Sequence, residues 1–219
     1  MTTPVFYELK NAVIGIAGLG GLGSNVAVAL TRLKTGRLIL VDYDKVEESN
    51  LNRQNYFPDQ IGRYKVDASI ENLKRIWPEA DLEGHNIRLT PERIMEVFAD
   101  AHLIAECFDR ADQKQMIVET VLSKMKDKII ISVSGLAGWG RSNDIVTRQI
   151  SDRLILVGDG TSGTGSGTPL TASRVGVAAY HQANAIVEVL MEQRVKTTKT
   201  LQEIRHETDP DHQRQAAGI

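Results

Sequence analysis

The sequence predicts an α/β fold, with a mostly parallel sheet flanked by helices and antiparallel strands in the C-terminal part. Two observations support this prediction. Short apolar runs alternate with amphipathic stretches at the spacing of β–α–β units, which is typical of a parallel sheet. After about Gly135 this alternation stops, and the runs 143–150 and 153–157 follow one another closely enough to pair as antiparallel neighbours.

The strands of the alternating part are expected where short apolar runs, rich in β-branched residues, lie between turn signals. Residues 11–17 (NAVIGIA) and 128–133 (KIIISV) show this pattern most clearly. The expected strands span 11–17, 37–41, 81–89, 102–108 and 128–133.

The helices are expected from apolar periodicity and from start and stop signals. Val26, Leu30 and Leu33 recur on one face of a helix. Pro78 ends a second helix, and Thr90 precedes a proline that is preorganised for the first position of a third. The expected helices span 24–34, 62–77, 91 onward, 111–125 and 171–192.

A single domain over residues 1–219 is the simplest organisation, with its core at about 11–193 and a polar tail at 194–219. Residues 158–168 contain five glycines and cannot carry a core. The tail is nearly free of large apolar residues, so we expect it to be loosely ordered.

Composition excludes several classes of function. The chain has 219 residues and a net charge of −2, so there is no electrostatic case for binding nucleic acid or a membrane surface. No stretch has the roughly 20 apolar residues needed to span a bilayer, and the N-terminus lacks the order of a signal peptide. Cys107 is the sole cysteine, so no intrachain disulfide and no cysteine-based zinc site can form. We therefore expect a cytoplasmic protein.

A glycine-rich turn indicates a nucleotide. Gly18, Gly20 and Gly23 form G-x-G-x-x-G between a predicted strand and helix, which makes the predicted sheet Rossmann-like. Such a turn lets the backbone approach a phosphate at the helix N-terminus. Asp42 ends the next strand, where a carboxylate can accept both ribose hydroxyls. The alternative is that the glycines serve only close packing of strand and helix.

The polar segment 43–54 helps to distinguish between two kinds of nucleotide-dependent enzyme. A nicotinamide-dependent oxidoreductase would explain the glycine turn but leaves Arg53, Lys65 and Asp109 unexplained. Arginine suits polyphosphate because its planar fork makes paired hydrogen bonds, and a lysine can point a compact charge at the same phosphates. Asp109 follows a strand, where a carboxylate can hold Mg²⁺ against phosphate oxygens. This set favours ATP over hydride transfer.

Four segments occur in order along the chain: GLGGLGS, LVDYDKVEESNLNRQ, IGRYK and the strand ending at Asp109. With them the chain resembles the ThiF/MoeB/HesA family of ubiquitin-like-protein activating enzymes over about residues 11–193, and looks most like a ThiF-type sulfur carrier protein adenylyltransferase. In that family the enzyme adenylates the C-terminal Gly-Gly carboxylate of a small carrier protein and releases pyrophosphate.

The resemblance implies site residues. It implies Arg53, Lys65 and Asp109 as catalytic residues, with Asp109 as the magnesium ligand. The nucleotide-binding residues that it implies are Gly18, Gly20, Gly21, Gly23, Asp42, Asn50, Arg53, Gln54 and Lys65.

The resemblance also implies partners and a pathway. ATP and Mg²⁺ are the expected cofactors, without zinc, and a ThiS-like sulfur carrier of thiamine thiazole biosynthesis is the expected substrate of a homodimer. Within the family, the alternatives are a molybdopterin-pathway activator and a tRNA-threonylcarbamoyladenosine dehydratase; no basic stripe with interleaved aromatics supports the tRNA substrate. Outside the family, the alternatives are a nicotinamide-dependent oxidoreductase and a non-catalytic carrier-binding scaffold.

The chain departs from the family in three ways. It lacks the two C-x-x-C pairs that bind structural zinc in many relatives, and it lacks the later cysteine that accepts the carrier in some. Many relatives also supply an arginine from an N-terminal helix, whereas Lys10 is the sole basic residue before the first expected strand. In addition to these three departures, Arg110 stands where relatives commonly have asparagine.

Each implied residue has a simpler alternative. Asp109 or Asp112 could cap the helix 111–125. Lys65 alone would be a solvated helix charge, and Arg53 a surface ion pair of little energetic value. Cys107 is expected to be a small buried hydrophobic residue.

The glycine-rich segment 158–168 has a hypothesis of its own. In the family, the corresponding segment lies over the adenylation site, and glycines there would leave room for a Gly-Gly tail. The alternative is a flexible surface linker. Replacing Gly163 and Gly165 with valine is expected to impair carrier adenylation more than ATP binding.

Overall fold

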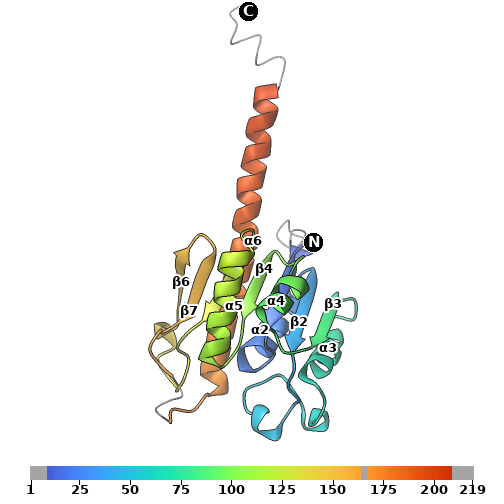
Figure 1. Cartoon of the computed structure of the whole chain (residues 1–219), viewed down its shortest axis with the longest axis vertical. Coiled ribbons are helices and arrows are strands. Elements are labelled where there is room, and N and C mark those ends of the chain that lie inside the picture. The colour runs from blue at the N-terminus through green and yellow to red at the C-terminus, as the bar shows by residue number, and fades with distance from the viewer. Residues whose placement is uncertain (1–8, 164–166, 209–219) are drawn as a thin grey trace, which may run out of the picture.

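The computed structural model describes residues 9–163 and 167–208, with side chains as far as residue 192. Figure 1 shows this part of the chain as one sheet with helices packed on it. Residues 164–166 and 209–219, in the expected glycine-rich segment and polar tail, lie outside the described part.

A seven-stranded sheet in the order β3-β2-β1-β4-β5-β7-β6 forms the centre of the described residues. All neighbouring strands are parallel except β6 and β7, which are antiparallel. The strands are β1 (Val13–Ala17), β2 (Arg37–Asp42), β3 (Leu82–Asn86), β4 (Leu103–Glu106), β5 (Ile129–Val133), β6 (Val146–Ser151) and β7 (Leu154–Gly158). The predicted fold class is confirmed, including the antiparallel pair.

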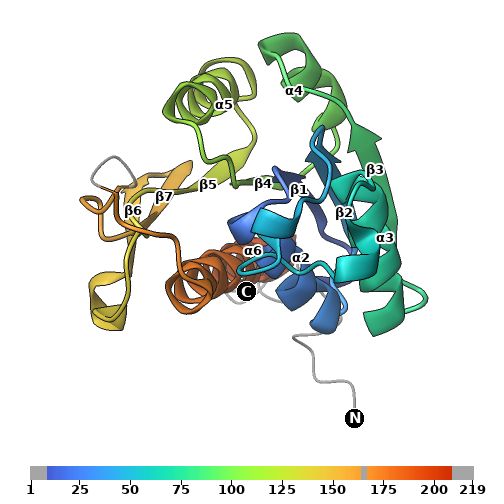
Figure 2. The same cartoon turned by 90° about the horizontal axis from the view of Figure 1, so that it is seen from below.

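Helices cover both faces of the sheet (Figure 2). They are α2 (Gly21–Arg32), α3 (Lys65–Ile76), α4 (Pro91–Val97), α5 (Ala111–Lys124) and α6 (Ala172–Thr208). Three short 3₁₀ turns are η1 (Glu48–Asn50), η2 (Pro58–Gln60) and η3 (Ser142–Asp144). Helices α4 and α5 lie on one face, and α2, α3 and α6 lie on the other.

The middle of strand β2, residues 38–41, is an unbroken apolar run because it is buried on both faces. Leu38 and Leu40 pack into the core cluster beneath α2, α3 and α6. Ile39 and Val41 pack into the opposite cluster, beneath α4 and α5. Because successive side chains of a strand point to opposite faces, a strand buried on both faces needs an unbroken apolar run.

The strand order places a crevice at one edge of the sheet. Strand β1 pairs with β2 on one side and with β4 on the other. The chain runs outward from β1 to β2 and β3, then crosses back to β4 and β5. Ligands of open α/β sheets bind at such a reversal, outside the carboxyl ends of the strands.

Three helix boundaries differ from the expectation. Helix α2 begins at Gly21, inside the glycine turn, and α3 begins at Lys65 because Gly62 has a φ of +87°, which is not helical. Helix α6 continues to Thr208 beyond the other elements (Figure 1), whereas the expected helix ended at residue 192. This stretch is rich in Lys, Gln, Glu and Arg, which are good helix formers, and proline is absent from it until Pro210.

Candidate active site

A pocket of about 480 Å³ lies at the carboxyl ends of β1, β2, β4 and β5. Its walls come from the glycine turn after β1, the end of β2, the polar segment before α3, and the connections from β4 to α5 and from β5 to β6. Further residues come from the segment after β7 and from the start of α6. The pocket therefore occupies the crevice that the strand order creates.

The glycine turn forms the floor of this pocket. Gly18, Gly20 and Gly21 line it, whereas Gly23 does not. Gly18 has a φ of +94°, and a Cβ on it would lie 2.9 Å from the carbonyl oxygen of Cys107. A Cβ on Gly23 would lie 1.8 Å from the carbonyl oxygen of Gly18, so Gly23 permits the turn to close against α2. The first turn of α2 has no acidic residue, and its amide groups face a site suited to an anion.

Asp42 stands at the edge of the pocket, at the end of β2. Its Oδ2 accepts a hydrogen bond from the backbone N–H of Leu19 at 2.6 Å, and its Oδ1 accepts one from the N–H of Asp44 at 2.8 Å. Burial raises the pKa of Asp42 above its ordinary value, and Lys65 and the two backbone donors offset part of this effect. These contacts hold a carboxylate at the position where a ribose is expected.

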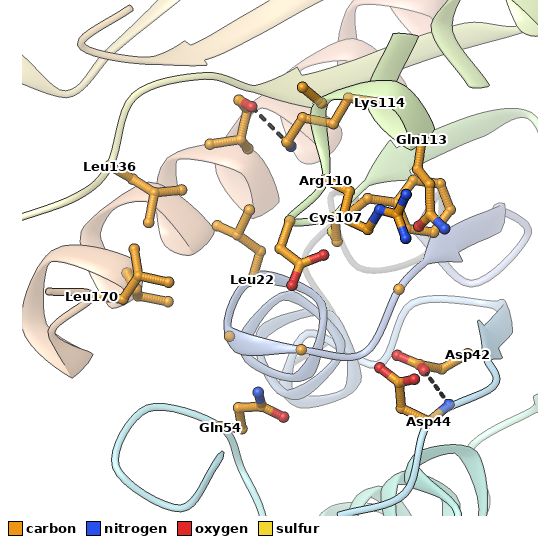
Figure 3. A pocket seen from close by; sticks show the side chains of 18 of the residues that line it. Leu22, Asp42, Asp44, Gln54, Cys107, Arg110, Gln113, Lys114, Leu136 and Leu170 are labelled. Atoms are coloured by element: carbon orange, nitrogen blue, oxygen red, sulfur yellow. Dashed lines mark hydrogen bonds between the residues drawn. The ribbon is translucent and has the colours of Figure 1, made fainter. Parts of the chain in front are cut away.

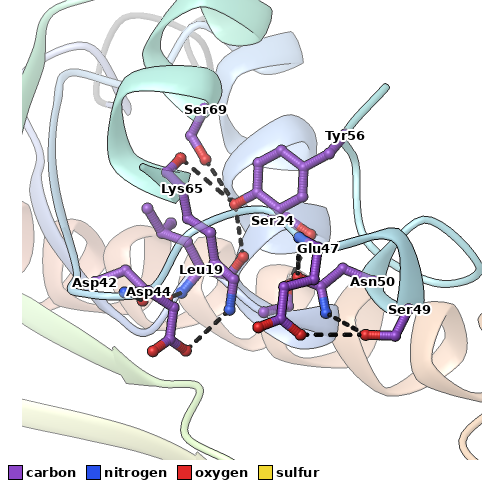
Figure 4. A network of polar contacts seen from close by, with 11 residues as sticks. Leu19, Ser24, Asp42, Asp44, Glu47, Ser49, Asn50, Tyr56, Lys65 and Ser69 are labelled. Carbon is purple, nitrogen blue, oxygen red and sulfur yellow. Dashed lines mark hydrogen bonds and ion pairs between the residues drawn. The ribbon is translucent and has the colours of Figure 1, made fainter. Parts of the chain in front are cut away.

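Lys65 is buried, unlike a solvated helix charge. Only 8% of its side chain is exposed, and its Nζ donates to Oδ2 of Asp44 at 3.0 Å (Figure 4). Asp44 is half exposed, so the lysine is held at the pocket by a carboxylate that remains in contact with solvent. The hydroxyl of Tyr56 donates to the carbonyl oxygen of Leu19 at 2.7 Å and lies 3.1 Å from Oγ of Ser69, which links the glycine turn to α3.

The polar segment 43–54 contributes Tyr43, Asp44, Arg53 and Gln54 to the pocket, but not Asn50. Asn50 is buried, and its Oδ1 accepts the N–H of Glu47 to close the η1 turn. The guanidinium of Arg53 donates to the carbonyl oxygen of Ser49 at 3.0 Å and to Oδ1 of Asn52 at 2.7 Å, and it forms no ion pair with any described residue. The buried Oε1 of Gln54 has no hydrogen-bond donor among the described residues, and the Nε2 of the same amide lies on the side of Gly20 in the glycine turn.

Asp109 and Arg110 line the pocket from the connection between β4 and α5, and both are exposed. Helix α5 has Arg110 at its N-cap and no side-chain cap, so neither Asp109 nor Asp112 acts as the capping residue. Arg110 instead pairs with Asp112 through two contacts, at 3.1 and 2.8 Å.

A buried ion pair behind Asp109 was not predicted from the sequence. Glu106 is fully buried, and both its oxygens accept from Nζ of Lys114, at 3.0 and 2.9 Å. Oγ of Ser132 donates to the same carboxylate at 2.6 Å, and the N–H of Phe108 donates at 2.7 Å. Lys114 also lines the pocket. The single signal in the sequence was an acidic residue inside the apolar run HLIAECF.

Cys107 is buried, as expected. Its Sγ donates to Oε1 of Gln182 at 3.4 Å, and Gln182 donates onward to the carbonyl oxygens of Glu106 and Ile131. Burial raises the pKa of the Cys107 thiol well above its ordinary value. The thiol is therefore unsuited to act as a nucleophile.

The far side of the pocket is apolar. Leu22, Leu136 and Leu170 lie there, across the pocket from Asp42 and Asp44 (Figure 3). Gly163, for which the valine substitution is predicted, lines the pocket, and Gly165 lies outside the described residues. The pocket thus has one charged, hydrogen-bonding side and one apolar side.

No group of three or more His, Cys, Asp or Glu side chains gathers to hold a metal ion in the described part of the chain. None of the described helices is both long and apolar enough to cross a membrane.

The strand order, with the glycine turn at its crevice, defines a Rossmann-like α/β fold. The chain matches the ThiF family over residues 3–210, and it belongs to that family.

Two proteins with related sequences match part of this chain. Ubiquitin-like modifier-activating enzyme 5 of Oryza sativa subsp. japonica is 41% identical over 93 residues, 42% of this chain and 22% of the relative. Adenylyltransferase and sulfurtransferase uba4 of Aspergillus niger is 37% identical over 135 residues, 61% of this chain and 28% of the relative. The matched region is thus less than a third of the length of either relative.

Solved structures share the fold. The tRNA N6-threonylcarbamoyladenosine dehydratase TcdA of E. coli, in complex with AMP, has a TM-score of 0.79 and 18% identity, covering 88% of this chain and 91% of that chain. E. coli MccB with ATP has a TM-score of 0.66 and 22% identity, covering 85% of this chain and 57% of that chain. Both resemblances confirm the fold class.

Proposed function

We propose that this chain is an adenylyltransferase that uses ATP to activate the C-terminal carboxylate of a ubiquitin-like carrier protein. The observation that carries the proposal is the meeting of Arg53, Lys65 and Asp109 with the glycine turn in one pocket. These groups come from three separate elements, and together they suit a polyphosphate at the N-terminus of α2. Family membership and the names of the relatives support the same activity.

The reaction places two anions next to one another. An oxygen of the acceptor carboxylate forms a bond to the α-phosphorus, the bond from that phosphorus to the bridging oxygen breaks, and pyrophosphate leaves. Lys65 and Arg53 would offset the negative charge, and the amides of the glycine turn would bind phosphate oxygens. Asp42 would hold the ribose. No protein nucleophile is needed, which agrees with the burial of Cys107.

Asp109 is the residue that would hold Mg²⁺. Magnesium in nucleotide sites is bound by one or two carboxylates together with phosphate oxygens and water, so one exposed carboxylate at the pocket fits this donor set. The bound ion would supply charge neutralisation at the phosphates.

The apolar side of the pocket supports a peptide-like acceptor. Leu136 and Leu170 face the space beyond the phosphate side, where the end of a carrier chain could lie (Figure 3). Within the family, we propose a ThiS-like sulfur carrier ending in Gly-Gly, in thiamine thiazole biosynthesis, and a homodimer as the working form. The single cysteine in the sequence supports this choice of branch.

Carrier-dependent ATP–pyrophosphate exchange tests the proposal, with candidate carriers that end in Gly-Gly. Exchange should occur with the wild-type protein and disappear in Asp109→Ala. Asp127→Ala is the matched control, because Asp127 is an exposed carboxylate that pairs with Lys128 outside the pocket, and it should keep full exchange.

Two other results would change the assignment. Tight binding of MgATP without exchange on any carrier would favour the tRNA dehydratase or the carrier-binding scaffold. Tight binding of NADH, with no effect of ATP on thermal stability, would favour the oxidoreductase.

A further inference from the structure

A buried ion pair joins the start of α6 to the end of β7. Arg174 and Asp159 lie 2.5 Å apart, with 4% and 10% of their side chains exposed. No other ion pair among the described residues has both partners so buried. Neither residue lines the pocket.

Arg174 also holds the connection between β5 and β6. Its Nη1 donates to the carbonyl oxygens of Gly140 and Arg141, at 2.6 and 2.9 Å. The guanidinium thus contacts two carbonyls and one carboxylate at once. A planar fork of donors can meet three such acceptors together, whereas the compact ammonium of lysine cannot reproduce that geometry.

Asp159 holds the segment that follows β7. Its Oδ1 accepts hydrogen bonds from the N–H groups of Thr161 and Ser162, both at 2.8 Å. Burial alone would raise the pKa of Asp159, but the hydrogen bonds from Ser162, Thr161 and Arg174 outweigh it and hold the pKa well below its ordinary value. The carboxylate is therefore ionised at neutral pH and ties this segment to α6.

The segments that the pair joins form the apolar side of the pocket. Gly135, Leu136 and Ala137 line it from the connection after β5, Ser162 and Gly163 from the segment after β7, and Leu170 and Val175 from the start of α6. The packing against the pair is close, since a Cβ on Gly135 would lie 2.1 Å from Oδ1 of Asp159.

The opposite side of the pocket is held by separate contacts. Asp42 bonds to Leu19, Tyr56 bonds to the carbonyl of Leu19, and Lys65 bonds to Asp44. None of these residues contacts Arg174 or Asp159 in the hydrogen bonds of the described chain. Packing links the two sides at Gly21, where an added Cβ would lie 3.0 Å from Val175 of α6, but no hydrogen bond among those named above does. A change at the ion pair should therefore disturb the nucleotide side far less than the acceptor side.

We propose that the Arg174–Asp159 pair is a positioning device for the acceptor side of the pocket, and that it aligns the end of the carrier chain with the nucleotide without touching either. The inference rests on the proposed adenylation, because it assigns the apolar side to the acceptor. It gives these two residues a role in the affinity for the carrier and in the rate of transfer, and none in the affinity for ATP.

The test compares Asp159→Asn, Arg174→Lys and the double variant Asp159→Asn/Arg174→Lys with the wild type. Carrier-dependent exchange gives the KM for the carrier and kcat, and calorimetry gives the Kd for ATP. Misplacement of the acceptor by about 1 Å is expected to lower kcat/KM for the carrier by roughly tenfold to a hundredfold, with ATP affinity changed by less than about twofold. Because Arg174 and Asp159 share one ion pair but each also holds a segment of its own, the double variant should lose less than the product of the two single losses.

Arg153→Gln is the matched control. Arg153 also donates to two backbone carbonyls, those of Met125 and Leu122, but it lies at the opposite end of β7 from the pocket. It should leave kcat/KM for the carrier unchanged. Hydrogen exchange adds a readout that needs no substrate: Asp159→Asn should lose protection in residues 134–141 and 159–163 and keep it in residues 18–30.

Several results would overturn the inference. Equal losses of ATP affinity and carrier kcat/KM would show a general structural role, and an unchanged carrier kcat/KM would show that the pair does not position the acceptor. If Asp159→Asn does not fold, Arg174→Lys keeps the charge and answers the same question. Absence of exchange in the wild type would reject the proposed function and the acceptor role with it, and the two failures are distinguishable because only in this case is the wild type inactive.

Discussion

Replacing Lys65 with methionine is expected to weaken ATP binding strongly while leaving the fold nearly as stable. Methionine fills the volume of the buried stem but removes the charge that faces the pocket. The partner Asp44 has half of its side chain exposed and becomes hydrated when the lysine is lost. The loss of folding free energy should therefore resemble that of an exposed ion pair, below about 1 kcal/mol.

The effect on ATP follows from the loss of one charge-assisted hydrogen bond to a phosphate. Such a bond contributes about 1.5–3 kcal/mol, which corresponds to roughly a tenfold to 150-fold rise in Kd. Isothermal titration calorimetry with MgATP at physiological ionic strength measures the Kd, and thermal unfolding measures stability. Lys45→Met is the matched control, because Lys45 is exposed near the same segment, lies over the ring of Tyr64 and does not line the pocket.

Two outcomes would refute this reasoning. If Lys65→Met binds ATP as tightly as Lys45→Met does, Lys65 does not contact the phosphates. If the melting temperature of Lys65→Met falls far below that of Lys45→Met, the ion pair with Asp44 is structural and the weaker binding follows from partial unfolding.

Three further predictions follow from buried groups. Lys114→Met leaves the fully buried carboxylate of Glu106 without its cation and should cost about 3–5 kcal/mol in denaturant unfolding, whereas Lys128→Met, which leaves the 74% exposed carboxylate of Asp127 in water, should cost less than about 1 kcal/mol; equal losses would contradict the reasoning. The lowered pKa of Asp159 stabilises the fold above the ordinary aspartate pKa of about 3.9, so the stability difference between wild type and Asp159→Asn should be complete at pH 7 and shrink as the pH falls below 4; a gap that widens in acid would count against it. Cys107→Ala should retain carrier-dependent exchange, since the buried thiol has a raised pKa, and its abolition would show that the thiol takes part.

The sequence predicted the elements and the edge of the sheet that carries the site. The alternation of apolar runs is a local property, so the order of strands and helices followed from it. Asp42 and Asp109 were assigned to the same edge because both follow strands, and parallel strands end together. The structure brings both to one pocket, with Arg53, Gln54 and Lys65.

Some expected site residues do not face the pocket. Gly23 and Asn50 belong to the same motifs as pocket residues, but the first closes the turn against α2 and the second closes η1. A motif gives the spacing of residues along the chain and does not state which way each side chain points. Direction depends on the local backbone, which is set by neighbouring hydrogen bonds.

The sequence by itself determined that this chain forms a mostly parallel α/β sheet with a phosphate-binding turn, because strand and helix periods and glycine spacing are encoded within a few residues of one another. The tertiary structure alone decided which distant groups meet. Glu106 reaches Lys114 and Ser132, and Asp159 reaches Arg174, because β5 lies between β4 and β7 and α6 crosses behind them. Strand order and register arise from the packing of the whole core, so no short stretch of sequence contains them.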